Sequence, residues 1–100
     1  MELKPVFSVW ELNTYVSLML SGDENMQDVT VNGEISGFKR HISGHLYFTL
    51  KDDRAAVRCV MFKPNALRLT FFPKDGMQVQ LHGSAGLYER DGSFQLNVRS

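Results

Sequence analysis

The sequence predicts an all-β protein, a closed barrel of five strands preceded by one α-helix. Apolar residues recur at every second position in several runs, and turn-forming residues separate these runs. Two glycines in the fourth run, Gly83 and Gly86, favour a closed barrel over an open antiparallel sheet covered by one helix, because closure needs sharply bent strands. A chain of 100 residues, 43% of them hydrophobic, encloses one modest core and therefore forms one domain.

The first predicted element is an amphipathic helix over about residues 9–20. Ser8 and Glu11 have the spacing of a capping box, in which each side chain satisfies a free backbone N–H at a helix start. Gly22 is a helix stop. Four apolar residues follow the cap at the spacing of one helix face: Leu12, Tyr15, Val16 and Met19.

Three strands are expected next, over about residues 28–38, 45–51 and 56–62. The first two alternate between apolar and polar residues, as half-buried strands do, and a glycine-containing loop joins them into a hairpin. Asp52-Asp53-Arg54 supplies the turn into the third. The residues that we assign to the inward face are Val29, Val31, Gly33, Ile35, Leu46, Phe48 and Leu50.

A short helix and a final hairpin complete the predicted order. Pro64 suits the first turn of a helix of two turns at most, and Asp75-Gly76 forms a turn. The fourth strand then runs from Met77 to Tyr88, with a bulge or sharp bend at its glycines. Asp91-Gly92 closes the hairpin onto a last strand. This order, with the helix after the third strand, is the layout of an OB-fold barrel, here with an additional N-terminal α-helix.

We place an N-terminal arm and helix at residues 1–27 and the barrel at residues 28–100. Net charge is zero and the pI is about 6.8, so the overall charge indicates no partner. The charges are nevertheless segregated, with one base and six acids in residues 1–34 and ten bases and five acids in residues 35–100. A basic body therefore follows an acidic arm.

The sequence contains no pattern that indicates catalysis, metal binding or membrane insertion. His41 and His45 have no third ligand nearby, and a turn accounts for Asp52-Asp53, so we expect no metal and no cofactor. Cys59 is the single cysteine and is expected to be a buried structural thiol. No nucleophile with its base, signal peptide or membrane-length apolar run is present. We expect a cytoplasmic, non-catalytic segment.

The residues expected to bind nucleic acid lie on the first hairpin and on the third strand with the residue that follows it. The hairpin loop holds two fixed cations and a histidine beside Phe38, with two glycines and no acid, and Phe38 has the outward parity of the preceding strand. Strand alternation also places Tyr47 outward. The parity of residues 57–62 is ambiguous, and Phe62 faces outward only if Val57, Cys59 and Met61 face the core. Aromatic side chains and cations together are what a single strand needs for stacking and phosphate neutralisation. The candidate residues are Phe38, Lys39, Arg40, His41, His45, Tyr47, Arg58, Phe62 and Lys63.

Longer motifs resemble a known family. Gly33 to Ser36, Gly44 to Asp52 and Arg58 to Phe62, supported by Ser8 to Asn13 and Asp75-Gly76-Met77, resemble the N-terminal domain of the exodeoxyribonuclease VII large subunit. The resemblance covers residues 7–99. It implies an OB fold that binds single-stranded DNA, followed by a catalytic domain and a long helical region that recruits several small subunits. It further implies that the intact enzyme hydrolyses single-stranded DNA from either end and that its catalytic residues would lie beyond Ser100.

These observations are compatible with two functions. In the first, the segment binds single-stranded DNA and delivers it to a catalytic domain absent from this chain. Lys39, Arg40, Arg58 and Lys63 neutralise phosphates, while Phe38, Tyr47 and Phe62 stack on bases. In the second, the barrel is a protein-interaction module that self-associates through the apolar face of its helix, and nucleic-acid contacts are incidental. Because Ser100 directly follows the last predicted strand, we expect the chain to be a designed fragment.

Overall fold

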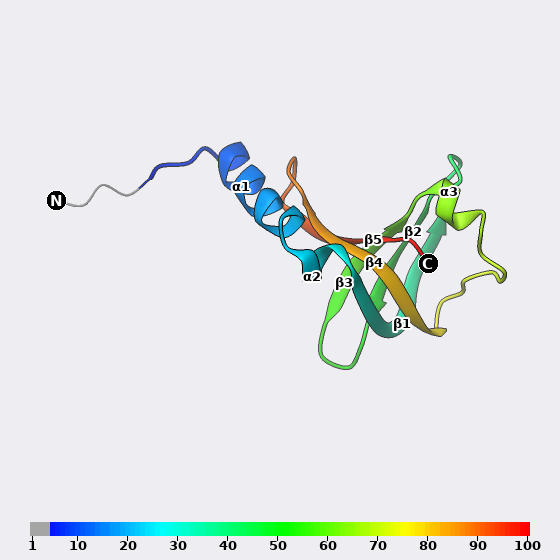
Figure 1. The fold of residues 1–100 in the computed structure, drawn as a ribbon. Coiled ribbons are helices and arrows are strands. Elements are labelled where there is room, and N and C mark those ends of the chain that lie inside the picture. Colours follow the sequence, from blue (N-terminus) through cyan, green and yellow to red (C-terminus); the bar gives the residue numbers. More distant parts are fainter. Residues whose placement is uncertain (1–4) are drawn as a thin grey trace.

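The computed structural model describes residues 5–100, which form a closed barrel with a helix at one end (Figure 1). The first four residues of the expected N-terminal arm lie outside the described residues. The strand order is β1-β2-β3-β5-β4, with β4 returning to β1. All pairs are antiparallel except β3 with β5. The strands are β1 (Val29–Arg40), β2 (Leu46–Lys51), β3 (Ala56–Met61), β4 (Gln78–Tyr88) and β5 (Ser93–Val98).

The helices are α1 (Val9–Ser21), α2 (Glu24–Gln27) and α3 (Lys63–Ala66). The predicted five-stranded barrel with its N-terminal helix is confirmed, and the alternative of an open sheet is wrong. The single turn of α2 was not predicted. The Asp23 side chain starts it by accepting hydrogen bonds from the backbone N–H groups of Asn25 and Met26, at 2.8 and 3.2 Å.

The barrel interior is filled by alternate residues of all five strands. Because successive strand residues point to opposite faces, the inward set of each strand reaches one shared core. β1 and β2 contribute the side chains predicted from their alternation, and the Cys59 thiol is buried as predicted. The buried cluster consists of Ile35, Leu46, Phe48, Leu50, Cys59, Met61, Ala85, Leu96 and Val98.

Helix α1 begins and ends where the sequence predicts. Ser8 and Glu11 form the capping box, with both side chain–backbone distances at 3.0 Å, and Gly22 is the C-cap. The helix contacts the β4–β5 hairpin through polar groups. Asn13 Nδ2 donates to the Glu89 carbonyl at 2.8 Å, and the Ser17 hydroxyl donates to Glu89 Oε1 at 3.0 Å.

The predicted apolar face of α1 is divided between the barrel side and the exposed side. Val16 is half-buried, whereas Leu12, Tyr15 and Met19 are 48%, 55% and 63% exposed. The Phe7 ring lies 5.8 Å from that of Tyr15 on the exposed side. No helix among residues 5–100 has the length and apolar character needed to cross a membrane.

Gly83 lies where β4 changes partners. It pairs with Val29 of β1 and with Val98 of β5, and the register continues on both sides without a shift. The prediction of a bulge at this glycine is therefore wrong. A Cβ at this position would lie 2.1 Å from the Asn97 carbonyl oxygen, so the close approach of β5 requires glycine, whereas a Cβ at Gly86 would meet no atom within 4 Å.

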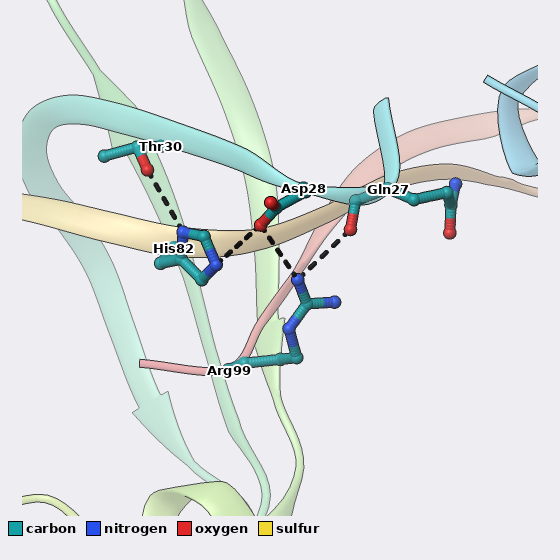
Figure 2. Close-up of polar contacts among 5 residues, drawn as sticks. All are labelled: Gln27, Asp28, Thr30, His82 and Arg99. Atoms are coloured by element: carbon teal, nitrogen blue, oxygen red, sulfur yellow. Dashed lines mark hydrogen bonds and ion pairs between the residues drawn. The ribbon is translucent and has the colours of Figure 1, made fainter. Parts of the chain in front are cut away.

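A polar cluster joins the start of β1, the middle of β4 and the last residues of the chain (Figure 2). Asp28 Oδ1 lies 2.8 Å from His82 Nε2 and 3.6 Å from Arg99 Nη2. His82 Nδ1 lies 3.1 Å from the Thr30 hydroxyl, and Arg99 Nη2 donates to the Gln27 carbonyl at 3.1 Å. These contacts stabilise the seam at which β4 meets β1.

Candidate nucleic-acid interface

A bulge in β1 determines which side chains of the first hairpin reach the outer face. The pairing with β2 shifts between Ser36 and Lys39, and Gly37 in this gap has a φ of 61°. The Asp75 carboxylate, from the loop before β4, accepts a hydrogen bond from the Phe38 N–H at 2.8 Å. No local sequence pattern predicts this contact, because 37 residues separate the two groups.

The bulge reverses the parity expected of Phe38. Its side chain is half-buried against the core, with its ring centroid 6.3 Å from that of Phe48. The outward orientation predicted for Phe38 is therefore wrong, because one residue beyond the regular register turns the strand over. The same reversal places Lys39 opposite Tyr47, on the outer face. Arg40 pairs with Leu46 and lies toward the end of the barrel.

The outer face of β2 and β3 forms a platform of aromatic, cationic and amide side chains. Cross-strand partners lie about 5 Å apart and share a face, so each register line defines a row. One row consists of Lys39, Tyr47, Val60 and Asn97. The next row consists of Ser36, Thr49, Arg58 and Gln95.

Three residues predicted to face outward are accessible: Tyr47 on β2, Arg58 on β3 and Phe62, which directly follows β3 and extends the platform. Tyr47 is 41% exposed and Phe62 is 39% exposed, and Arg58 is also exposed. Cys59 and Met61 lie in the core, which resolves the ambiguous parity in favour of an outward Phe62. Val60 has outward parity and lies outside the core cluster, yet it is only 4% exposed. Its cross-strand partners Tyr47 and Asn97 flank it on the outer face and cover it.

His45 connects the platform to α3. Its ring meets that of Phe62 edge-on, with centroids 5.1 Å apart. Its Nδ1 accepts a hydrogen bond from the Lys63 N–H at 2.9 Å, which fixes the start of α3 beside the β1–β2 loop. The predicted helical position of Pro64 is confirmed. His45, Phe62 and Lys63 are therefore brought together as neighbours.

The loop between β1 and β2 is held by its own hydrogen bonds. The His41 N–H donates to the His45 carbonyl and the Gly44 N–H to the His41 carbonyl, both at 2.9 Å. Gly44 has a φ of 94°, which a glycine adopts without strain. The His41 ring lies 6.2 Å from the Tyr47 ring, edge-on, and so extends the aromatic surface of the platform.

Two half-buried amides on β5, Gln95 and Asn97, belong to the platform but were not predicted. They reach it through the parallel pairing of β3 with β5, and no local pattern indicates which strands pair across a barrel. The alternation of polar residues along β5 was the sequence signal that could have indicated these two amides.

Hydrogen bonds from Ser93 hold the pKa of Asp91 below its usual value, and the nearby charge of Arg58 contributes less. One acid therefore lies near one end of the platform.

The candidate cations are not neutralised by close ion pairs. Within residues 5–100, ion pairs shorter than 4.0 Å involve Lys51, His82 and Arg99 as the basic partners. Lys39, Arg40, Arg58 and Lys63 have no such acidic partner in that range. A polyanion can approach these side chains without displacing a protein carboxylate.

Other polar groups have structural roles. Asp52 Oδ1 accepts hydrogen bonds at 2.8 Å from the N–H groups of Arg54 and Ala55, which hold the pKa of this carboxyl below its usual value. These bonds form the β2–β3 turn, as predicted. Burial raises the pKa of the Cys59 thiol to about 11. No group of three or more metal-ligating side chains is found in the described part of the chain.

Comparison with known proteins decides the family. The family model described as an OB-fold nucleic acid binding domain matches residues 7–100. The chain belongs to this family. It is also similar to the exodeoxyribonuclease 7 large subunit of Natranaerobius thermophilus, with 50% identity over 91% of this chain and 22% of that protein. The protein of the same name from Ruminiclostridium cellulolyticum is 44% identical over 95% of this chain and 24% of its own length.

These similarities confirm the resemblance inferred from the sequence motifs. The chain spans about a quarter of the length of these curated relatives. A solved structure, asparaginyl-tRNA synthetase from Pyrococcus horikoshii, has a TM-score of 0.59 at 18% identity over 87% of this chain and 21% of that one. At this identity the likeness supports the OB fold alone.

Proposed function

We propose that this OB-fold domain binds single-stranded DNA along the outer face of β2 and β3. The observation that carries the proposal is the arrangement of Tyr47 and Phe62, both exposed, beside Lys39 and Arg58, which have no close acidic partner among residues 5–100. Stacking platforms combined with cations are the general means by which OB folds hold single strands. The β2–β3 face is also the one that OB folds commonly use.

The binding mode follows from the chemistry of these side chains. Bases of a single strand have both faces free and stack on the Tyr47 and Phe62 rings, each stack contributing about 1–3 kcal/mol of binding free energy. Lys39 and Arg58 lie in adjacent rows and neutralise phosphates. Gln95 and Asn97 offer hydrogen bonds to base edges without a charge requirement.

Within an exodeoxyribonuclease VII large subunit, the role of this domain would be to deliver single-stranded DNA to the catalytic domain. We infer that the domain holds the strand while a catalytic domain outside this chain hydrolyses phosphodiester bonds, and that the small subunit binds other regions. The support is the identity of 44–50% to proteins of that name. The domain itself is proposed to bind without cutting.

One observation favours a second function, a protein contact. Leu12, Tyr15 and Met19 lie exposed on α1, away from the polar contacts of the helix with Glu89. Exposed apolar patches often mark protein interaction sites. Figure 1 places α1 at one end of the elongated molecule and α3 toward the other. A contact through α1 would therefore leave the platform free.

Fluorescence anisotropy with labelled oligothymidine and a duplex of equal length tests the proposed function. We expect tighter binding to the single strand, because duplex bases are already stacked and paired. With about three phosphate contacts, the slope of log K against log salt should be roughly −2. Equal affinity for the duplex, or affinity that does not change with salt, would contradict this mode.

A further inference from the structure

A hollow beside α3 lies outside the platform. It opens between α3 and the chain that leads from α3 to β4, near the β1–β2 loop. Two cations, Arg40 and Lys63, line it, both with exposed side chains. Its apolar lining includes Phe38, Leu46, Leu67, Phe71, Phe72 and Pro73.

Three side chains of the apolar lining are largely exposed. Phe72 is 77% exposed, Leu67 is 68% exposed and Phe71 is 48% exposed. Phe38, which the bulge turns inward, lines the hollow from the β1 side. Clustered apolar exposure of this kind indicates a ligand or partner rather than a packing requirement.

We propose that this hollow receives one unstacked base of the bound single strand, with Arg40 and Lys63 on the neighbouring phosphates. The inference rests on the proposed function and names a second base-binding position. Charge complementarity favours a nucleotide as the occupant, because the lining contains two cations and no acidic residue. Aromatic rings combined with cations suit a base and its phosphate.

Lys63 makes the hollow continuous with the platform. Its N–H donates to His45 Nδ1, and the His45 ring contacts that of Phe62. Its side chain extends along the β1–β2 loop, where a Cβ on Gly44 would lie 3.0 Å from Lys63 Cδ. A strand that stacks on Phe62 therefore meets Lys63 next and then the hollow.

The test compares Phe72→Ala with Trp10→Ala, a control that removes an exposed aromatic ring from α1. Phe72→Ala should weaken binding of labelled oligothymidine at least about fivefold with an unchanged salt slope, because a stack carries no counterion. Trp10→Ala should bind like wild type. Wild-type affinity for a folded Phe72→Ala variant would overturn the base pocket while leaving the platform intact. If the wild-type domain binds no single-stranded DNA, the proposed function fails as well.

A second variant keeps the test independent of any loss of folding. Phe72→Trp in a Trp10→Phe background retains an aromatic ring and gives a single tryptophan. Oligothymidine should quench its emission over the same concentrations that raise the anisotropy. An unchanged emission during saturable DNA binding would overturn the proposal.

Sedimentation tests whether the hollow is instead a protein contact. A wild-type dimer that Phe72→Ala converts to a monomer would assign the hollow to contact between two copies of the chain and would overturn the proposal.

Discussion

Lys39 and Tyr47 are cross-strand partners on the outer face of the barrel, and a bulge in β1 makes them so. Without the shift between Ser36 and Lys39, strict alternation would turn Lys39 toward the barrel interior and Phe38 outward. Gly37, at a φ of 61°, supplies the backbone conformation for this shift. One glycine thus places a cation beside the Tyr47 ring.

Substitution of Gly37 tests this relationship. Gly37→Val should lower the free energy of unfolding by about 1–2 kcal/mol, because β-branched residues tolerate the left-handed conformation poorly. No atom lies within 4 Å of a Cβ there, so the cost is conformational. Gly37→Asn should be nearly neutral, since asparagine adopts this conformation more readily. Urea unfolding measures both, and equal stability of the two variants would exclude the conformational explanation.

Stacking and charge on the platform are separable by salt dependence. Tyr47→Ala should weaken oligothymidine binding by about 1–3 kcal/mol at an unchanged slope, because stacking releases no counterion. Arg58→Ala should flatten the slope of log K against log salt by about 0.7. Arg54→Ala, in the β2–β3 turn, removes the same charge away from the platform and should leave the slope unchanged. If neither platform variant affects binding, the DNA lies on another face.

Two glycines of β4 form a matched pair for stability. Gly83→Ala should cost about 3 kcal/mol of unfolding free energy, because the new Cβ would overlap the Asn97 carbonyl oxygen and force β5 away. Gly86→Ala places its Cβ in open space and should be tolerated. Thermal unfolding of both variants provides the comparison. A stable Gly83→Ala variant would show that β5 moves at little cost.

Because the Cys59 thiol is buried, the domain should lose stability at alkaline pH. Burial raises its pKa from 9.0 to about 11, so the native state favours the protonated thiol. The resulting stabilisation is fully present below about pH 9 and is lost as the pH rises through 11. Urea midpoints at pH 7 and 10.5 should therefore fall more for wild type than for Cys59→Ala. An identical fall would assign the alkaline loss to other groups.

The reactivity of the same thiol provides an independent check. Cys59 is 3% exposed, so alkylation of the native domain at pH 8 should be slow and should accelerate on unfolding in urea. Mass spectrometry follows the modification directly. Rapid alkylation without denaturant would contradict the burial of this side chain.

Local sequence patterns predicted the secondary structure well because the relevant physics is local. The capping box at Ser8 and the Asp91-Gly92 turn depend on neighbouring residues alone. Alternation likewise predicted the inward set of β2 and the exposed Tyr47. The binding roles of these residues stay predictions.

Non-local contacts account for what the sequence did not predict. The orientation of Phe38 depends on a bulge that Asp75 supports from a distant loop. Gln95 and Asn97 reach the platform through parallel pairing with β3. The burial of Val60 depends on flanking side chains from two other strands. A one-residue change of register reverses every side chain beyond it, so periodicity alone misassigned this end of β1.

Backbone amide chemical shifts of the ¹⁵N-labelled domain, followed during titration with oligothymidine, locate the DNA-binding face. If single-stranded DNA binds on the outer face of β2 and β3, the amides of Lys39, Tyr47, Arg58 and Phe62 shift together and saturably, while those of α1 and of the His82 cluster do not shift. Shifts confined to α1 or to the seam between β4 and β1, or a spectrum unchanged at saturating DNA, would contradict binding on the β2–β3 face.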